Sequence, residues 1–146
     1  MTVNAILKSK GDDVFVIGPD ESVEAAASLL TTRRIGAVMV VGPEGQILGI
    51  LSERDIVRGI AEQGGHILGQ PVRTLMTGEV LRCTRGDVVA DLMSLMTARR
   101  IRHLPVVDEG RLVGLISIGD VVKTHVAEKE MEAASLRQYI WRDSGA

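Results

Sequence analysis

The stretch Gly49-Ile50-Leu51-Ser52-Glu53-Arg54-Asp55 returns in altered form as Gly114-Leu115-Ile116-Ser117-Ile118-Gly119-Asp120. Outward from these two stretches, residues 14–57 align with residues 80–122 through a single-residue gap. A repeat of this length predicts one folding unit used twice, related by a pseudo-twofold axis. The seam between two such units is a common place for a small-ligand site.

Each copy predicts the order strand, helix, strand, strand, helix. The first helix of copy one places apolar residues at helical spacing: Val23, Ala26, Ala27 and Leu30. Copy two fills the same positions with Val89, Leu92, Met93 and Met96. In copy one a short strand over 14–17 precedes this helix, and residues 35–41 and 47–51 predict two strands joined by a turn. We therefore predict an α+β fold of two β-α-β-β-α repeats plus a C-terminal helix.

The predicted boundaries are 1–62 for the first repeat, 63–71 for a flexible linker, 72–127 for the second repeat and 128–146 for a C-terminal helical extension. The helical tail has an apolar stripe that the first copy lacks: Val122, Val126, Ala133, Leu136 and Ile140. Such a stripe needs a partner surface, either across the pair of repeats or on another subunit.

Composition narrows the classes of function. The net charge is −2 and the aromatic residues are Phe15, Tyr139 and Trp141, which argues against nucleic-acid binding. No apolar run approaches the ~20 residues of a membrane span, so no membrane partner is expected. The lone Cys83 fits a reducing compartment, and we predict a cytoplasmic location.

Catalytic and metal-binding groups are scarce. The three histidines, His66, His103 and His125, lie far apart without metal-ligand spacing, and no sequence neighbour activates Cys83. We interpret Cys83 as a small buried hydrophobe. The sequence thus predicts neither an enzyme nor a metal site nor a catalytic cofactor.

The pattern Gly-x-x-Ser-x-x-Asp, present in both copies, allows two interpretations. It is a capping box, in which the serine and the aspartate satisfy backbone N–H groups at a helix start. Taken alone, the motif favours the cap, but the same geometry suits a ligand site: the helix start and the serine hydroxyl suit a phosphate, the aspartate accepts from a ribose diol, and the glycine admits a ligand close to the backbone.

Basic residues favour the second interpretation. Arg102-His103 stands in copy two where copy one has Gly36-Ala37, and a cationic pair in an apolar strand is costly unless an anion meets it. The pairs Arg33-Arg34 and Arg99-Arg100 add donors, although basic residues at helix ends also offset the helix dipole.

Three features of the chain resemble tandem cystathionine-β-synthase (CBS) domains. They are the repeat order, the two Ser-x-x-Asp endings, and the strands Ile35-Gly36-Ala37-Val38-Met39-Val40-Val41 and Ile101-Arg102-His103-Leu104-Pro105-Val106-Val107. The resemblance spans roughly residues 2–127, and is closest to the stand-alone bacterial type, which often pairs into a homodimer. It implies clefts between the central sheets that bind adenosine-containing ligands such as AMP, ADP, ATP, NAD(H) or S-adenosylmethionine.

The resemblance also implies residue roles. Asp55 and Asp120 would hold ribose hydroxyls, and Ser52 and Ser117 would bind phosphate or ribose-linked oxygens. An adenine slot would be lined by Phe15, Ile35, Gly36 and Ala37. Phosphate contacts would come from Arg102 and His103, with Lys10 as a weaker candidate. Arg54 and Pro105 complete the predicted ligand-binding set, and because Gly119 replaces Arg54 in copy two, the two sites need not bind alike.

We predict a non-catalytic adenine-nucleotide sensor that regulates a protein partner the sequence does not identify, and that forms a homodimer. The alternative is a structural or protein-interaction module with no small-molecule ligand, in which the Ser/Asp pairs are caps only. We expect the C-terminal helix to contribute to the dimer.

Overall fold

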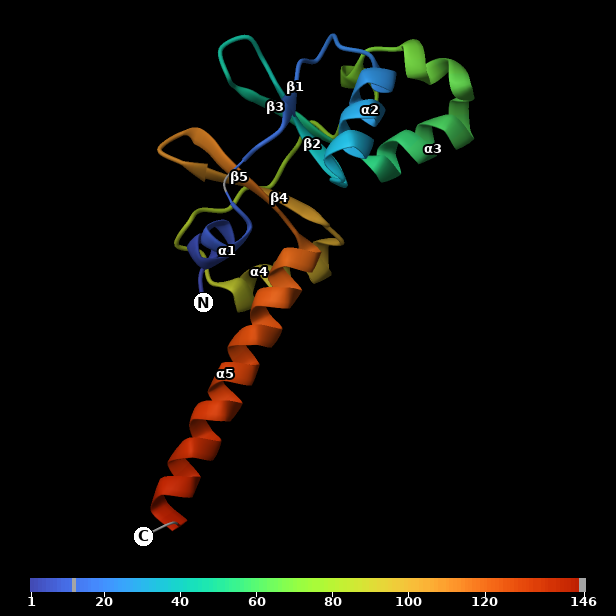
Figure 1. Cartoon of the computed structure of the whole chain (residues 1–146). Helices are drawn as coiled ribbons and strands as arrows, with labels where there is room; N and C mark the ends of the chain where they lie inside the picture. Colours follow the sequence, from blue (N-terminus) through green and yellow to red (C-terminus); the bar gives the residue numbers. More distant parts are fainter. Residues whose placement is uncertain (12, 145–146) are drawn as a thin grey trace. The chain divides into compact units, whose positions relative to one another are not determined.

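The computed structural model describes residues 1–11 and 13–144 of the 146-residue chain. It has the predicted α+β architecture, with a long C-terminal helix (Figure 1). The chain divides into two compact units, and each unit takes segments from both repeats. We call them the β1–β3 unit (Asp12–Cys83 and Leu104–Leu115) and the α5 unit (Met1–Gly11, Thr84–His103 and Ile116–Ala146).

The β1–β3 unit is built on a three-stranded sheet of β1 (Val16–Ile17), β2 (Ala37–Val41) and β3 (Ile47–Ser52). The strand order is β1-β2-β3, with β2 parallel to β1 and antiparallel to β3. Two helices, α2 (Val23–Arg33) and α3 (Glu53–Gln63), pack with this sheet. The segment predicted as a linker forms a 3₁₀ helix, η1 (Gly65–Gly69), whose Ile67 is buried in the core, and η2 (Val72–Thr74) follows.

The apolar stripes of the first helices are confirmed in both copies. In α2 the buried stripe residues are Val23, Ala26 and Leu30, and in α4 (Val89–Arg99) they are Val89, Leu92 and Met96. Both helices end on an arginine in the left-handed conformation, Arg34 with φ 54° and Arg100 with φ 55°. The two copies therefore share the same backbone conformation at the end of this helix.

The second copy departs from the predicted order at its first strand. There, a single parallel bridge joins Cys83 to Val106 of β4 (His103–Asp108). In the first copy the ladder extends further because Met39 N donates a hydrogen bond to the Phe15 carbonyl. The residue aligned with Met39 is Pro105, which has no N–H to donate. The proline thus explains why this strand shrinks to one bridge. β4 pairs with β5 (Arg111–Ser117) in a two-stranded sheet.

The α5 unit joins the start of the chain to the second copy. It contains α1 (Val3–Lys10), α4 and α5 (Ile118–Ser144). Val3 N donates to the Asp87 carbonyl at 2.9 Å, and Val89 N donates to the Met1 carbonyl at 3.0 Å. α5 is one helix across the predicted boundary at 127/128, and residues 145–146 of the predicted extension lie outside the described residues.

Candidate functional site

Both Ser-x-x-Asp motifs form a capping box at a helix start. In α3, Asp55 N donates to Ser52 Oγ at 3.1 Å and Ser52 N donates to Asp55 Oδ2 at 2.9 Å. In α5, the bonds between Ser117 and Asp120 have the same two lengths, 3.1 and 2.9 Å. The capping interpretation is thus correct for both copies, and each aspartate has one carboxylate oxygen engaged in the cap.

In each copy, the residue just before the central strand is hydrogen-bonded to the first residue of the capped helix. The Gly36 carbonyl accepts a hydrogen bond from Glu53 N at 2.9 Å, within the β1–β3 unit. The Arg102 carbonyl accepts one from Ile118 N at 2.8 Å, within the α5 unit. Residues that the sequence predicts as ligand contacts are therefore brought together in two groups. The first is Gly36, Ser52 and Asp55, and the second is Arg102, Ser117 and Asp120.

The aspartate of the second group has a cation closer to it than the aspartate of the first group has. Lys10 Nζ lies 2.7 Å from Asp120 Oδ2. Partial burial of the Asp120 carboxyl opposes ionisation, but the bonds from Lys10 and Ser117 outweigh it and hold its pKa below the ordinary value of 3.8. Asp120 is therefore an anion at neutral pH. The first group has a weaker counterpart, since Arg58 Nη1 lies 3.8 Å from Asp55 Oδ1.

The other predicted residues lie at varied depths. Arg54 and Arg102 are exposed, whereas His103 is half-buried at the start of β4. The Arg33 guanidinium carbon lies 4.9 Å from the centroid of the Phe15 ring, which is a cation–π contact. Ala37 and Pro105 are buried, and the Pro105 carbonyl accepts a hydrogen bond from Cys83 N at 3.0 Å.

Packing explains two further residues of the motif regions. A Cβ on Gly49 would lie 2.6 Å from the Thr77 carbonyl oxygen, so the space beside this glycine is filled by the chain itself. This differs from the expectation that the glycine admits a ligand. Cys83 is 2% exposed with its Sγ 3.6 Å from the Pro105 carbonyl, which confirms it as a buried hydrophobe.

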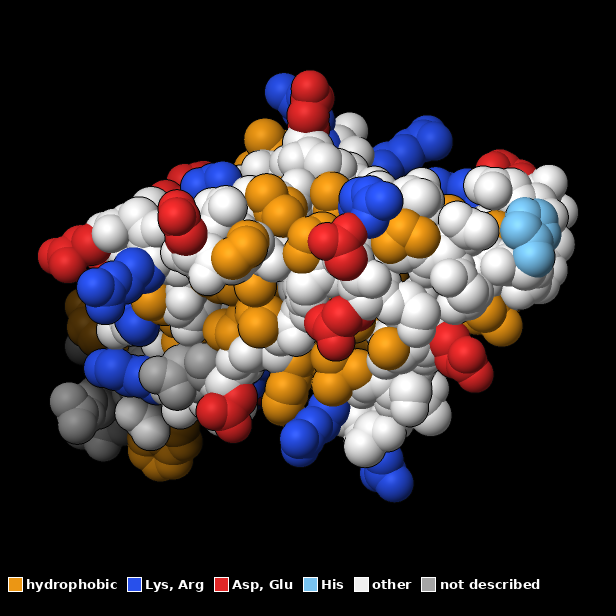
Figure 2. All heavy atoms as spheres, turned by 90° about the horizontal axis from the view of Figure 1, so that it is seen from above, with side chains coloured by type: hydrophobic (Ala, Val, Ile, Leu, Met, Phe, Trp, Pro, Cys, Tyr) orange, Lys and Arg blue, Asp and Glu red, His pale blue; other side chains and the backbone are white. Residues whose placement is uncertain are grey.

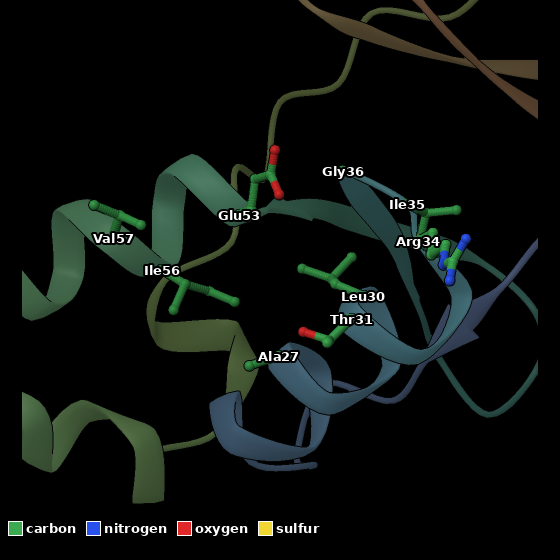
Figure 3. Close-up of a pocket in the computed structure, with 9 residues that line it drawn as sticks. All are labelled: Ala27, Leu30, Thr31, Arg34, Ile35, Gly36, Glu53, Ile56 and Val57. Atoms are coloured by element: carbon green, nitrogen blue, oxygen red, sulfur yellow. The ribbon is translucent and has the colours of Figure 1, made fainter.

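A cavity of about 430 Å³ lies between α2 and α3, beside the first group (Figure 3). Ala27, Leu30 and Ile56 line its apolar part, and Thr31, Arg34 and Glu53 supply polar groups. It shares Ile35 and Gly36 with the predicted adenine slot. Sequence reasoning missed the α3 side of this cavity. Val57, which lines it from α3, is 65% exposed in the structure, and no sequence motif marks this residue.

Charged side chains of both signs lie on the face of the molecule that Figure 2 shows. They are scattered among hydrophobic ones. Within residues 1–11 and 13–144, no three His, Cys, Asp or Glu side chains gather as a metal site would require. In the same ranges, every helix is too short or too polar to span a bilayer.

Comparison with known proteins identifies the family. The sequence model of the CBS domain matches twice, over residues 7–62 and 72–127. The chain belongs to the CBS domain family. The predicted resemblance to tandem CBS domains is thus confirmed.

Three proteins similar to this chain are matched over most of their length. The mitochondrial CBS domain-containing protein CBSX3 of Arabidopsis thaliana is 36% identical over 147 residues, covering 95% of this chain and 71% of the relative. The crystal structure of a CBS-domain protein of Agrobacterium tumefaciens has a TM-score of 0.83 at 46% identity, covering 86% of this chain and 99% of that one. The CBS pair of protein MJ0100, solved with 5′-methylthioadenosine and S-adenosyl-L-methionine, has a TM-score of 0.77 at 22% identity, covering 88% and 98%.

Proposed function

We propose that this CBS pair is a non-catalytic sensor of an adenosine-containing nucleotide of the AMP, ATP or NAD(H) type. The observation that carries the proposal is the repeated backbone bond from a capped helix start to Gly36 and to Arg102. This bond holds a strand-start residue beside a serine hydroxyl and an aspartate. A ribose diol needs an anionic acceptor, which the aspartate supplies, and a phosphate needs donors, of which the serine hydroxyl supplies one.

The charges distinguish the two groups. Lys10 and Arg102 belong to the Asp120 group, which suits a ligand with phosphates. The Asp55 group has Gly36 and Ala37 in place of Arg102 and His103, and suits the uncharged nucleoside part. The fold itself is compatible with adenosine ligands, because the CBS pair of protein MJ0100 holds two of them.

Regulation follows from binding only if the ligand prefers one arrangement of the protein over another. We propose that the CBS pair works in the cytoplasm as a homodimer and passes this preference to a protein partner. None of the proposed site residues serves as a nucleophile or as an acid–base pair in this proposal. Binding alone is the activity.

The capping boxes also favour a second candidate, a structural or protein-interaction module without a ligand. Each aspartate already accepts a backbone bond from its serine, and Asp120 also pairs with Lys10. In that case both aspartates act only in folding.

The deciding experiment is a thermal-shift panel of AMP, ADP, ATP, NAD, NADH and S-adenosylmethionine, followed by calorimetric titration. A ligand at 100 times its Kd stabilises the fold by about 2.7 kcal/mol, which is a measurable shift. Asp120→Ala should weaken binding by about 1.5–3 kcal/mol at its site. Glu128→Ala is the matched control, because Glu128 is another α5 carboxylate in an ion pair, 2.6 Å from the Met1 amine. No stabilisation by any ligand would favour the interaction module.

A further inference from the structure

The C-terminal part of α5 extends past the helices that it packs against. Within the α5 unit, Val121 is fully buried and Glu128 contacts the Met1 amine. Beyond that contact, residues 129–141 are exposed except for a half-buried Ala133. Figure 1 shows this part of α5 continuing well beyond α1 and α4. Large apolar side chains lie open here, including Met131 and Leu136, both 60% exposed.

One face of α5 has the spacing of a two-stranded coiled coil. Positions separated alternately by four and three residues are Val122, Val126, Lys129, Ala133, Leu136 and Ile140. We call these six residues the α5 stripe. Its members Val122 and Val126 are 42% and 48% exposed, although they lie in the part of α5 that packs on its own unit. The stripe therefore faces away from that packing along its whole length.

We propose that the α5 stripe pairs with the α5 stripe of a second copy in a parallel, in-register coiled coil. The charges beside the stripe select this polarity. In a parallel pair, a flanking residue faces the partner's residue five positions later. Glu132 then faces the partner's Arg137, which matches an acidic group with a basic one, twice by symmetry.

The antiparallel arrangement opposes like charges. With the stripes fully overlapped, Glu130 faces the partner's Glu130 and Glu132 faces the partner's Glu132. Like charges across a helix pair are destabilising. Lys129 is the one charged member of the stripe, and its ammonium lies 3.3 Å from Glu132 of its own helix. A single polar layer of this kind lowers stability and fixes the register.

The proposal assigns the surface of the homodimer proposed above, and it does not depend on a bound nucleotide. Its test is the concentration dependence of mass, measured by sedimentation of the full chain. Leu136→Asp should raise the dimer dissociation constant by about tenfold or more, because a charge enters the paired face. Met131→Asp is the matched control, since Met131 is equally exposed on the opposite side of α5, and should change it by less than about twofold.

A charge exchange tests the polarity. Glu132→Lys and Arg137→Glu should each weaken the dimer, and the double variant should restore it. Leu136→Cys should form a disulfide-linked dimer on mild oxidation, whereas Met131→Cys should not. The proposal is overturned if the wild-type chain stays monomeric, if Leu136→Asp and Met131→Asp behave alike, or if the double variant does not recover. In the last two cases a dimer through another surface survives, and nucleotide titration of the same variants reports separately on the sensor.

Discussion

The start of α3 and the start of α5 have the same capping bonds but different charges around them. The serine–aspartate distances agree between the two caps, and in both a strand-start carbonyl accepts a bond from the first helical N–H. Around this shared frame, Lys10 lies 2.7 Å from Asp120, while Arg58 lies 3.8 Å from Asp55. The capping bonds are thus common to both helix starts, whereas the cations beside the aspartates differ between the two proposed ligand groups.

The largest expected effect tests whether both copies depend equally on their core. Leu51 and Ile116 occupy aligned positions, one in each unit, and both are fully buried. Leu51→Ala and Ile116→Ala should each lower the free energy of unfolding by about 2–5 kcal/mol, measured by urea denaturation. Val57→Ala, at a 65% exposed site, should change it by less than about 0.5 kcal/mol. A loss in only one of the two buried variants would show that the copies are not equivalent in stability.

The caps should be equivalent to each other. Ser52→Ala and Ser117→Ala each remove the acceptor for an aspartate N–H, and each should cost about 0.5–2 kcal/mol of unfolding free energy. Threonine at either position keeps a hydroxyl and should retain most of the stability. If one alanine variant were neutral, its serine would have no capping role and the match between the two helix starts would fail.

The Lys10–Asp120 pair should give the Asp120 group a pH-dependent contribution to the stability of the fold. The lowered pKa of Asp120 means that its ionisation stabilises the fold above its ordinary pKa of 3.8, and that this contribution is lost as the pH falls through the folded-state pKa. Lys10→Met should raise the pKa of Asp120 and cost about 0.2–1 kcal/mol at pH 7, because both side chains are partly exposed.

Carboxyl titration by NMR and urea unfolding at pH 7 and pH 3 measure the two quantities. The stability difference between wild type and Lys10→Met should be present at pH 7 and should shrink as the pH falls below 3.8. An Asp120 pKa that does not move in the variant would rule out Lys10 as its partner.

The smallest expected effect on stability concerns the first strand of the second copy, which is reduced to one bridge. Pro105→Val supplies an N–H at the position aligned with Met39, so it should add a ladder bond like the one from Met39 to Phe15. The bond contributes about 0.5–1.5 kcal/mol, and the loss of proline costs about 0.4–1 kcal/mol through the unfolded chain, so the net stability should barely change. Hydrogen exchange is the readout. An unprotected amide at position 105 would show that something other than the proline ends this ladder.

Local patterns were predictable from the sequence because their causes are local. The α2 and α4 stripes follow from helical spacing, and the capping boxes follow from serine and aspartate three residues apart. The long-range contacts were not predictable. Lys10 and Asp120 were both candidates, but they are separated by 110 residues, and no local signal pairs them. Gly49 was interpreted through a ligand, whereas Thr77 fills the space beside it.

The cavity between α2 and α3 shows a second limit of the sequence. Its lining comes from two helices and the turn before β2, and which exposed side of α3 meets α2 depends on how the helices pack. The ligand roles of Phe15, Arg54, Ala37 and Pro105 stay predictions, because they came from the family resemblance. Arg33 stacks on Phe15, which ties that ring to the end of α2.

The interleaving of the two units constrains how the protein is made. The hydrogen bonds of Val3 with Asp87 and of Met1 with Val89 cannot form until residues 87–89 have been synthesised. Residues 104–115 complete a unit that began at residue 12. A ribosome releases the chain from the amino end, so neither unit can close until most of the second repeat has been synthesised. Cutting the gene between the two repeats would therefore yield fragments that each lack part of both units.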